Sequence, residues 1–186
     1  EGEETLFIGT GNGLFRSEDG GREWKRGGAE LSSVEVNFLA LHSEKNILYS
    51  VSPMGVYVSE DLGRRWERIF VTSTQVEDAE GVDNGTDTED TDEAVMSTER
   101  VTAVAFKGDK ILLGTKNGVY HSEDGGKGWL RLGPIGLGNS EVNHLFIYQE
   151  TLYAATEKGI FSFSEGKGDW KEVSKGITKG RATYLS

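Results

Sequence analysis

The sequence contains no cysteine and only two prolines among its 186 residues. The lack of cysteine excludes disulfide bonds, thiolate catalysis and cysteine-based zinc sites. No run approaches the roughly 18 apolar residues that a membrane-spanning helix requires. Basic residues are also few, at 20 against 31 acidic residues, and the formal net charge is −11. Because nucleic acids and anionic membranes attract basic surfaces, we predict neither nucleic-acid binding nor membrane insertion.

The negative charge is concentrated in one segment. Nine acidic residues lie between Glu77 and Glu93, a stretch without lysine, arginine or aromatic residues, and without them the net charge would be near −2. Such a stretch cannot bury enough apolar surface to offset the entropy lost on ordering. We therefore predict a single domain over residues 1–186 with a disordered acidic loop at about 72–98. Its oxygen-rich groups do not follow EF-hand spacing, so we predict neither a metal site nor a cofactor.

Glycine is abundant, with 26 residues, and much of it lies in a repeated motif. The pattern Ser-x-Asp-x-Gly-x-x-Trp occurs three times in full, and a degenerate fourth copy ends at Trp170. Each tryptophan of the chain ends one copy, and the tryptophans are 42, 63 and 41 residues apart. The acidic loop accounts for the longer middle spacing. The three full copies place their defined residues at Ser17, Asp19, Gly21 and Trp24; at Ser59, Asp61, Gly63 and Trp66; and at Ser122, Asp124, Gly126 and Trp129.

The residues around each copy repeat as well. Two short apolar runs separated by a tight turn precede each copy, and Asn12-Gly13 and Asn117-Gly118 are strong hairpin signals. A short run follows each tryptophan, and after a loop comes a further predicted strand. Four strands in a period of about 42 residues, without helical periodicity, predict an all-β fold of four-stranded propeller blades. The further strands are expected at Val36–Leu41, Val101–Phe106, Val142–Tyr148 and Ala182–Leu185.

The repeated motif resembles the Asp-box, or BNR repeat, of sialidases, sortilin-type receptors, xyloglucan-degrading enzymes and photosystem II assembly factors. The resemblance covers essentially the whole chain outside the acidic loop, and it implies a β-propeller built from four repeats. It slightly favours an extracytoplasmic location, whereas the sequence itself indicates no compartment. Since these relatives have unrelated activities, the resemblance does not define a function.

The aspartates of the motif are expected to be structural rather than catalytic. Each carboxylate can accept backbone N–H groups of its own turn, and the motif glycine permits the left-handed backbone of such a turn. The tryptophan is expected to pack between the hairpin and the blade, with its indole N–H bonded to a turn carbonyl.

The two ends of the repeat leave the closure of the propeller open. The first strand aligns with the second strand of a blade, and the last residues align with the start of a first strand. One arrangement is a closed four-bladed ring whose C-terminal strand completes the first blade. A second is a half-ring that pairs with another copy to give eight blades, and a third is a segment of a larger propeller completed by another chain.

Candidate binding residues lie where the chain enters the innermost strand of each blade, at the mouth of the central channel. Their charges alternate from blade to blade, which indicates either ion pairs between neighbouring blades or a polar site for a ligand or partner. The residues are Glu35, Asn37, Arg100, Thr102, Glu141, Asn143, Arg181 and Thr183.

These residues do not predict catalysis. The resemblance to sialidases would imply three arginines converging on a substrate carboxylate, and only Arg100 and Arg181 fall at the mouth. We therefore predict no catalytic residue and a non-catalytic protein-interaction scaffold, whose partner is another protein or a second copy completing the propeller. The alternative is a carbohydrate-binding or glycoside-hydrolysing, sialidase-like protein.

Overall fold

The computed structural model describes residues 5–71, 100–133, 135–176 and 182–183. The predicted acidic loop and Arg181 lie outside the described residues. The described part forms fifteen strands in four antiparallel sheets, and it contains no helix that could span a membrane. We call the sheets blades one to four. The strands are β1 (Leu6–Thr10), β2 (Gly13–Ser17) and β3 (Lys25–Arg26) in blade one; β4 (Phe38–His42), β5 (Ile47–Ser52), β6 (Gly55–Ser59) and β7 (Glu67–Val71) in blade two; β8 (Val101–Lys107), β9 (Lys110–Thr115), β10 (Gly118–Ser122) and β11 (Leu130–Arg131) in blade three; and β12 (Val142–Tyr148), β13 (Thr151–Thr156), β14 (Gly159–Phe163) and β15 (Trp170–Glu172) in blade four.

Each blade is a meander in which strands adjacent in sequence are paired. The prediction of an all-β chain with four sheets is confirmed, and blades two to four have four strands each. Strand β4 begins at Phe38, two residues later than predicted. The reason is that the N–H of Val36 donates to the carbonyl of Thr10 in blade one at 3.0 Å, rather than to its own sheet.

A hydroxyl group organises the turn between the second and third strand positions of each blade. In blade one, Thr10 Oγ1 donates to the Gly13 carbonyl at 2.8 Å and accepts the Asn12 N–H at 3.1 Å. Gly13 has a φ of 117°, a conformation that favours glycine. Ser52, Thr115 and Thr156 make the same pair of bonds in the other blades. These local bonds explain why the hairpins have one register throughout the chain.

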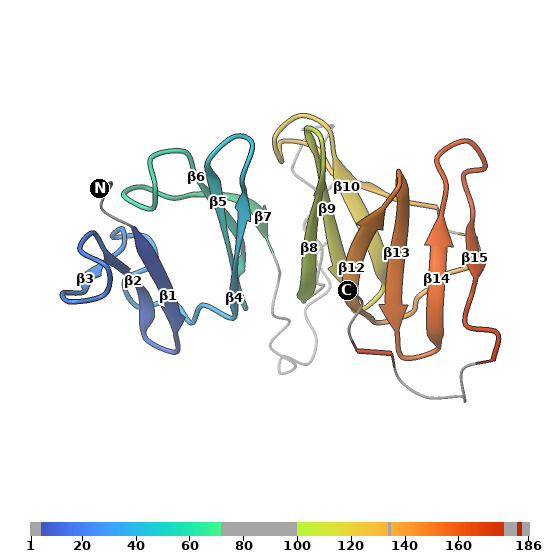
Figure 1. The fold of residues 1–186 in the computed structure, drawn as a ribbon, viewed down its shortest axis with the longest axis horizontal. Helices are drawn as coiled ribbons and strands as arrows, with labels where there is room; N and C mark the ends of the chain where they lie inside the picture. Colours follow the sequence, from blue (N-terminus) through green and yellow to red (C-terminus); the bar gives the residue numbers. More distant parts are fainter. Residues whose placement is uncertain (1–4, 72–99, 134, 177–181, 184–186) are drawn as a thin grey trace, which may run out of the picture.

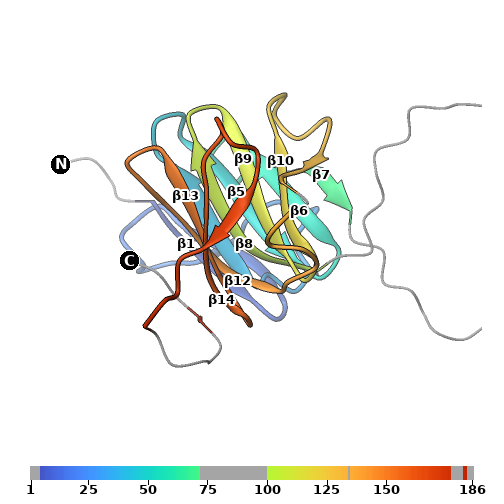
Figure 2. The same cartoon turned by 90° about the vertical axis from the view of Figure 1, so that its right-hand side faces the viewer.

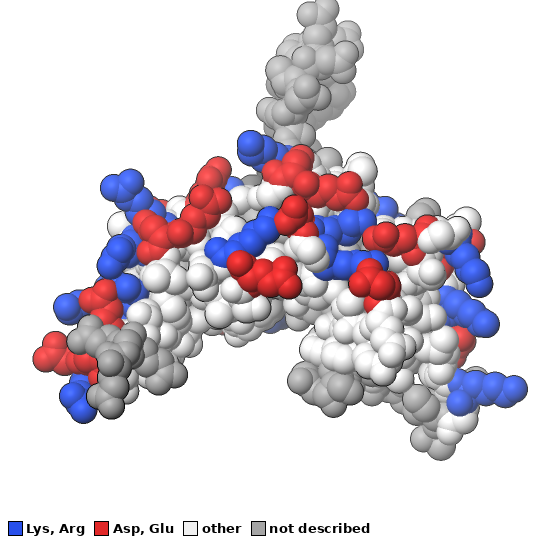
Figure 3. Space-filling view, turned by 45° about the horizontal axis from the view of Figure 1, so that its top comes forward, with Lys and Arg blue, Asp and Glu red and all other residues white. Residues whose placement is uncertain are grey.

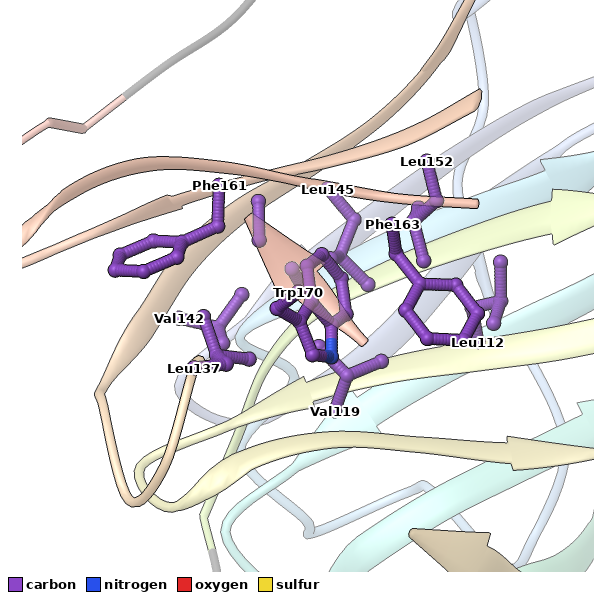
Figure 4. Close-up of a cluster of buried hydrophobic side chains, with 11 residues drawn as sticks. Leu112, Val119, Leu137, Val142, Leu145, Leu152, Phe161, Phe163 and Trp170 are labelled. Atoms are coloured by element: carbon purple, nitrogen blue, oxygen red, sulfur yellow. The ribbon is translucent and has the colours of Figure 1, made fainter. Parts of the chain in front are cut away.

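The hydrophobic core lies between the blades, in three clusters. The cluster between blades three and four is the largest, and Figure 4 shows Trp170 at its centre with Phe163, Leu112 and Val119 around it. Phe163 and Trp170 have ring centroids 5.1 Å apart. The clusters between blades two and three and between blades one and two are built from equivalent strands. Because each blade is thin, its apolar residues become buried only when a neighbouring blade covers them.

The four blades form an open row rather than a closed ring. Blades one and four lie at opposite ends of the molecule in Figure 1, and Figure 2 shows the sheets stacked one behind another. The closed ring, one of the three arrangements that the sequence left open, is therefore not found among the described residues, in which β1 pairs only with β2. Instead, Ala182 stays beside blade four, where its N–H donates to the Thr156 carbonyl at 3.0 Å.

Candidate functional site

The Ser-x-Asp turns are closed by hydrogen bonds of the motif residues to one another. Asp19 Oδ1 accepts the Ser17 hydroxyl at 2.7 Å and the backbone N–H groups of Arg22 and Glu23 at 2.9 and 3.0 Å. Ser17 Oγ in turn accepts the Gly21 N–H at 2.8 Å. The same arrangement recurs around Asp61 and Asp124.

These hydrogen bonds favour the ionised carboxylates. The pKa of Asp19 is lowered chiefly by the backbone N–H of Glu23, and the pKa of Asp124 chiefly by that of Gly128. The pKa of Asp61 is lowered chiefly by the backbone N–H of Arg65. The described residues contain no group of three or more His, Asp or Glu side chains that could hold a metal ion. The three carboxylates therefore act on their own turns, where they hold the hairpin in shape.

The motif tryptophans differ in their exposure. Trp66, Trp129 and Trp170 are only 5%, 7% and 4% exposed, whereas Trp24 is 36% exposed. Trp129 Nε1 donates to the Ile69 carbonyl of blade two at 3.0 Å, and Trp170 Nε1 donates to the Leu132 carbonyl of blade three at 3.0 Å. The motif tryptophan thus reaches the preceding blade, and Trp24 has no preceding blade to contact within the described part of the chain.

The predicted channel-mouth residues meet in one cavity of about 390 Å³, which we call the axial cavity. It lies where β4, β8 and β12 begin, and Ala182 and Thr183 pass beside it. Glu35 is exposed and is not part of the lining, and Arg181 lies outside the described residues. The lining comprises Asn37, Arg100, Thr102, Glu141, Asn143 and Thr183 from the predicted set, together with Phe38, Val101 and Lys116.

Hydrogen bonds link the neighbouring blades at this level. Thr102 Oγ1 of blade three is bonded to the Val142 carbonyl of blade four, and Asn143 Nδ2 donates to the Ala182 carbonyl at 2.7 Å. The alternating charges had also predicted ion pairs between blades. Glu35 and Arg100 form no ion pair with any described residue, so these two positions do not link the blades in that way.

Sequence reasoning missed Lys116. This residue occupies the turn between β9 and β10, not the entry to an innermost strand, so aligning the strand entries could not find it. The signal that could have found it is its position just before Asn117-Gly118, because this turn and the strand entries lie on the same face of a propeller.

A second cavity, of about 330 Å³, lies between blades one and two beside the first two Ser-x-Asp turns. Its charges are largely compensated. Arg16 pairs with Glu18 at 2.6 Å, and Arg64 approaches the same carboxylate at 3.6 Å. Sequence reasoning missed this cavity as well, since all of its charged residues except Asp19 occupy variable positions in and around the motif.

Charged side chains also alternate across the face that carries the Ser-x-Asp turns (Figure 3). Lys110 joins Glu123 of its own blade and Glu165 of blade four, both at 2.9 Å. Lys107 contacts Glu150 at 3.2 Å and Glu165 at 3.7 Å. These ion pairs connect blades three and four at the surface, opposite the axial cavity.

No protein-family model matches the sequence, and no curated protein matches it either. Solved structures with a similar fold include the GH74 xyloglucanase from Xanthomonas campestris, with a TM-score of 0.64 and 17% identity over 95% of this chain and 30% of that chain. The extracellular domain of the hybrid two-component system BT4673 from B. thetaiotaomicron has a TM-score of 0.68 and 12% identity, covering 100% of this chain and 23% of that chain. YCF48 bound to D1 peptide has a TM-score of 0.59 and 16% identity, covering 91% and 49%.

These three structures are β-propeller-type proteins, and identities of 12% to 17% indicate a shared fold rather than a shared activity. The chain spans only 23% to 49% of their lengths. In fold, the four blades thus correspond to part of each of these three structures.

Proposed function

We propose that the chain is a non-catalytic interaction scaffold of the Asp-box propeller type, and that a second copy of the chain completes its propeller. The observation that carries this proposal is the outward face of blade one. This face has the composition of a blade-to-blade interface but no blade against it in the described structure.

Equivalent positions are identified by strand pairing. Ile8 pairs with Phe15, just as Leu113 pairs with Tyr120 and Ala154 pairs with Phe161. Leu113 and Ala154 are fully buried between blades, whereas Ile8 is 45% exposed. Trp24 of blade one is likewise more exposed than the equivalent tryptophans of the other three blades. Blade one therefore presents the surface that the following blades bury against their predecessors.

Among the described residues, blade one also has no innermost strand. Leu41 of β4 is 53% exposed, although its equivalents Phe106 and Ile147 pack into interblade clusters. The difference arises because Phe106 packs against His42 and Tyr49 of blade two and β12 packs along β8, whereas no innermost strand of blade one lies beside β4 in the described part of the chain.

Blade four, at the other end of the row, has an outward face that could pack against blade one of another copy. Val142, Leu145 and Ile147 join the cluster with blade three, so the alternation of a strand places His144, Phe146 and Tyr148 on the far face of β12. Tyr148 and Val173 of blade four are 55% and 41% exposed.

The backbone of Ala182 extends this complementarity to the missing strand. Its bond to Thr156 repeats the bond of Val36 to Thr10. Val36 leads into the innermost strand of the next blade, so Ala182 occupies the equivalent position after blade four. Within the described residues, blade one therefore has no innermost strand, and Ala182 stands where the chain would enter such a strand.

A second copy is favoured as the partner because the chain contains both halves of the missing interface. Joined head to tail, two copies place blade four of each against blade one of the other, with two identical contacts and no open face. The contact would continue an interface that the chain already forms three times internally.

The test is the mass of the chain in solution, measured by sedimentation velocity over a range of concentrations. The wild-type chain is expected at twice the mass of one copy, and Ile8→Glu at the mass of one copy, because a carboxylate would be buried unpaired in the contact. Leu130→Glu is the matched control, since Leu130 is 68% exposed on the outermost strand of blade three. A monomeric wild type, an open-ended series of oligomers, or equal dissociation of both variants would overturn self-association.

The alternative function, glycoside hydrolysis, has less support from the geometry. Glycosidases generally use two carboxylates flanking the scissile bond. Among the described residues that line the axial cavity, Glu141 is the one acidic side chain. We expect no release of reducing sugar from xyloglucan and none of sialic acid from sialosides. Turnover that disappears in Glu141→Gln would favour the enzyme over the scaffold.

A further inference from the structure

We infer that the axial cavity binds a carboxylate group. The inference goes beyond the association proposed above and does not depend on it, because every group that carries it comes from one chain. Three features support it: two cations without partners, one buried amide without a partner, and a local opening between blades two and three.

The two cations are Arg100 and Lys116. Neither makes a hydrogen bond or an ion pair with any residue that the structure describes, although both line the cavity. Other cations of the same blade are engaged. Arg131 donates to the carbonyls of Asn117 and Gly138, and Lys110 has two carboxylate partners. In a chain with a net charge of −11, two cations facing one cavity without carboxylate partners are an unusual local concentration of positive charge.

The unpartnered amide is Asn37 Nδ2. This nitrogen is buried and has no hydrogen-bond partner, and leaving such a donor unsatisfied is unfavourable. The backbone N–H of Asn37 donates to the Val51 carbonyl at 2.8 Å, which fixes the residue at the entry to its blade. The equivalent Asn143 Nδ2 is satisfied by the Ala182 carbonyl. Asn37 lines the cavity, and turning its amide toward a ligand oxygen would give the side chain the acceptor that its equivalent finds at Ala182.

The opening lies between two innermost strands. Strand β12 packs along β8, whereas β4 touches β8 at only a few points. The hydroxyl of Thr102 links blade three to blade four by a hydrogen bond. The side-chain nitrogen of Asn37 makes no equivalent hydrogen bond to a described residue of blade three. The cavity of about 390 Å³ that results is within the size range of small-molecule sites.

Charge and geometry favour a carboxylate over a phosphate. The guanidinium of arginine binds the two oxygens of a carboxylate side by side, and an ammonium group adds a point charge. Glu141 adds one negative charge to the lining and already has an interaction of its own. The lining therefore has a net charge of +1, which suits a singly charged carboxylate better than a doubly charged phosphate.

The carboxylate could belong to a small organic acid or to an acidic residue of a partner protein. Isotope-labelled full-length chain would be titrated with sodium acetate, sodium succinate, sodium phosphate and a short aspartate-containing peptide. The shifts of backbone and Asn side-chain amide signals are followed by NMR. We expect saturable shifts at Asn37 and around Arg100 with the carboxylates. Saturation by acetate or succinate identifies a small acid as sufficient, and saturation by the peptide alone identifies a partner protein as the source.

Variants separate binding at the cavity from general charge effects. Arg100→Gln and Lys116→Gln are each expected to weaken carboxylate binding roughly tenfold or more, because each removes a charge-assisted hydrogen bond. Lys158→Gln is the control, since Lys158 lies in the equivalent turn of blade four, one position after the counterpart of Lys116, pairs with Glu157 and does not line the cavity. It should bind as the wild type does.

Asn37→Ala provides a further readout. It should weaken binding without lowering the thermal midpoint of unfolding, since it removes a donor that is unsatisfied in the free protein. The inference is overturned if no carboxylate gives saturable shifts, if phosphate binds as tightly as the carboxylates, or if Lys158→Gln weakens binding as much as Lys116→Gln does. Repeating the titration with Ile8→Glu distinguishes the two proposals: binding should persist when association is blocked.

Discussion

Replacement of Trp129 by alanine tests whether the blades are held together by the tryptophan of the Ser-x-Asp motif. Trp129 is 7% exposed, and its indole N–H donates to the Ile69 and Gly126 carbonyls, both at 3.0 Å. Its ring meets Phe70 of blade two edge to face, with centroids 5.2 Å apart. Truncating a buried tryptophan to alanine costs about 3–5 kcal/mol. At about 2–4 °C per kcal/mol for a chain of this length, the thermal midpoint should fall by roughly 6–20 °C.

Trp24 provides the matched comparison within the same motif. It is 36% exposed, and its indole N–H donates to Gly21 of its own turn at 3.1 Å. Because more of its ring is already exposed and no preceding blade covers it in the described part of the chain, Trp24→Ala should reduce the free energy of unfolding by less than Trp129→Ala does. Both variants should be made in the Ile8→Glu background, so that association does not add to the stability of either one.

The assay is guanidinium-induced unfolding followed by far-ultraviolet circular dichroism, with the slope m compared among variants. Equal losses for Trp129→Ala and Trp24→Ala would refute the reasoning, because burial between blades would then not determine the effect. A loss of less than about 1 kcal/mol for Trp129→Ala would refute it as well. Trp129→Phe keeps the aromatic contact but leaves the Ile69 carbonyl without this donor, and about 1–2 kcal/mol should be lost.

Three further predictions concern the turns and the surface. The pKa of Asp124 is lowered in the folded state, so its contribution to stability is present above the unfolded-state pKa and is lost as the pH falls through the folded-state pKa. The thermal midpoint of Asp124→Asn, measured at decreasing pH, should therefore fall less steeply than that of the wild type. Glu165→Gln should reduce stability by less than about 1 kcal/mol, since its ion pair with Lys110 is partly exposed, and added salt should remove the difference from wild type in denaturant titrations. In the same titrations, Gly13→Ala should destabilise the protein more than Gly20→Ala does. Both residues have positive φ, but a Cβ at Gly13 would lie 2.5 Å from the Leu31 carbonyl oxygen, whereas one at Gly20 meets nothing within 4 Å. Equal losses of stability would contradict this steric argument.

The blades could be predicted from sequence because their determinants are local. The hairpin β9–β10 needs only two short apolar runs, the Asn117-Gly118 turn and the hydroxyl of Thr115. The motif residues likewise bond within their own turn, so the conformation around Asp124 depends on about eight consecutive residues. Such information is contained in a short stretch of sequence, and repetition of that stretch multiplies the evidence.

The arrangement of the four blades as an open row rather than a closed ring could not be predicted from local sequence. The angle between two blades depends on how residues from both pack, as Trp129 packs against Ile69 and Phe70, and no single segment contains that information. The axial cavity was predicted in part. Aligning the strand entries found Arg100 and Asn37, but the missing partners of both residues depend on the spacing between blades two and three.

Blade one, with three strands and a single neighbouring blade, makes local stability unequal along the row. In repeat proteins the free energy of each unit depends on its own hydrogen bonds and on its contacts with adjacent units. The amide protons of β1 and β2 should therefore exchange with solvent sooner than those of β9, whose blade is covered on both faces. Unfolding would begin at the N-terminal end of the row and proceed inward, and a partner that covers Ile8 and Trp24 would slow this opening while leaving the interior blades as they are.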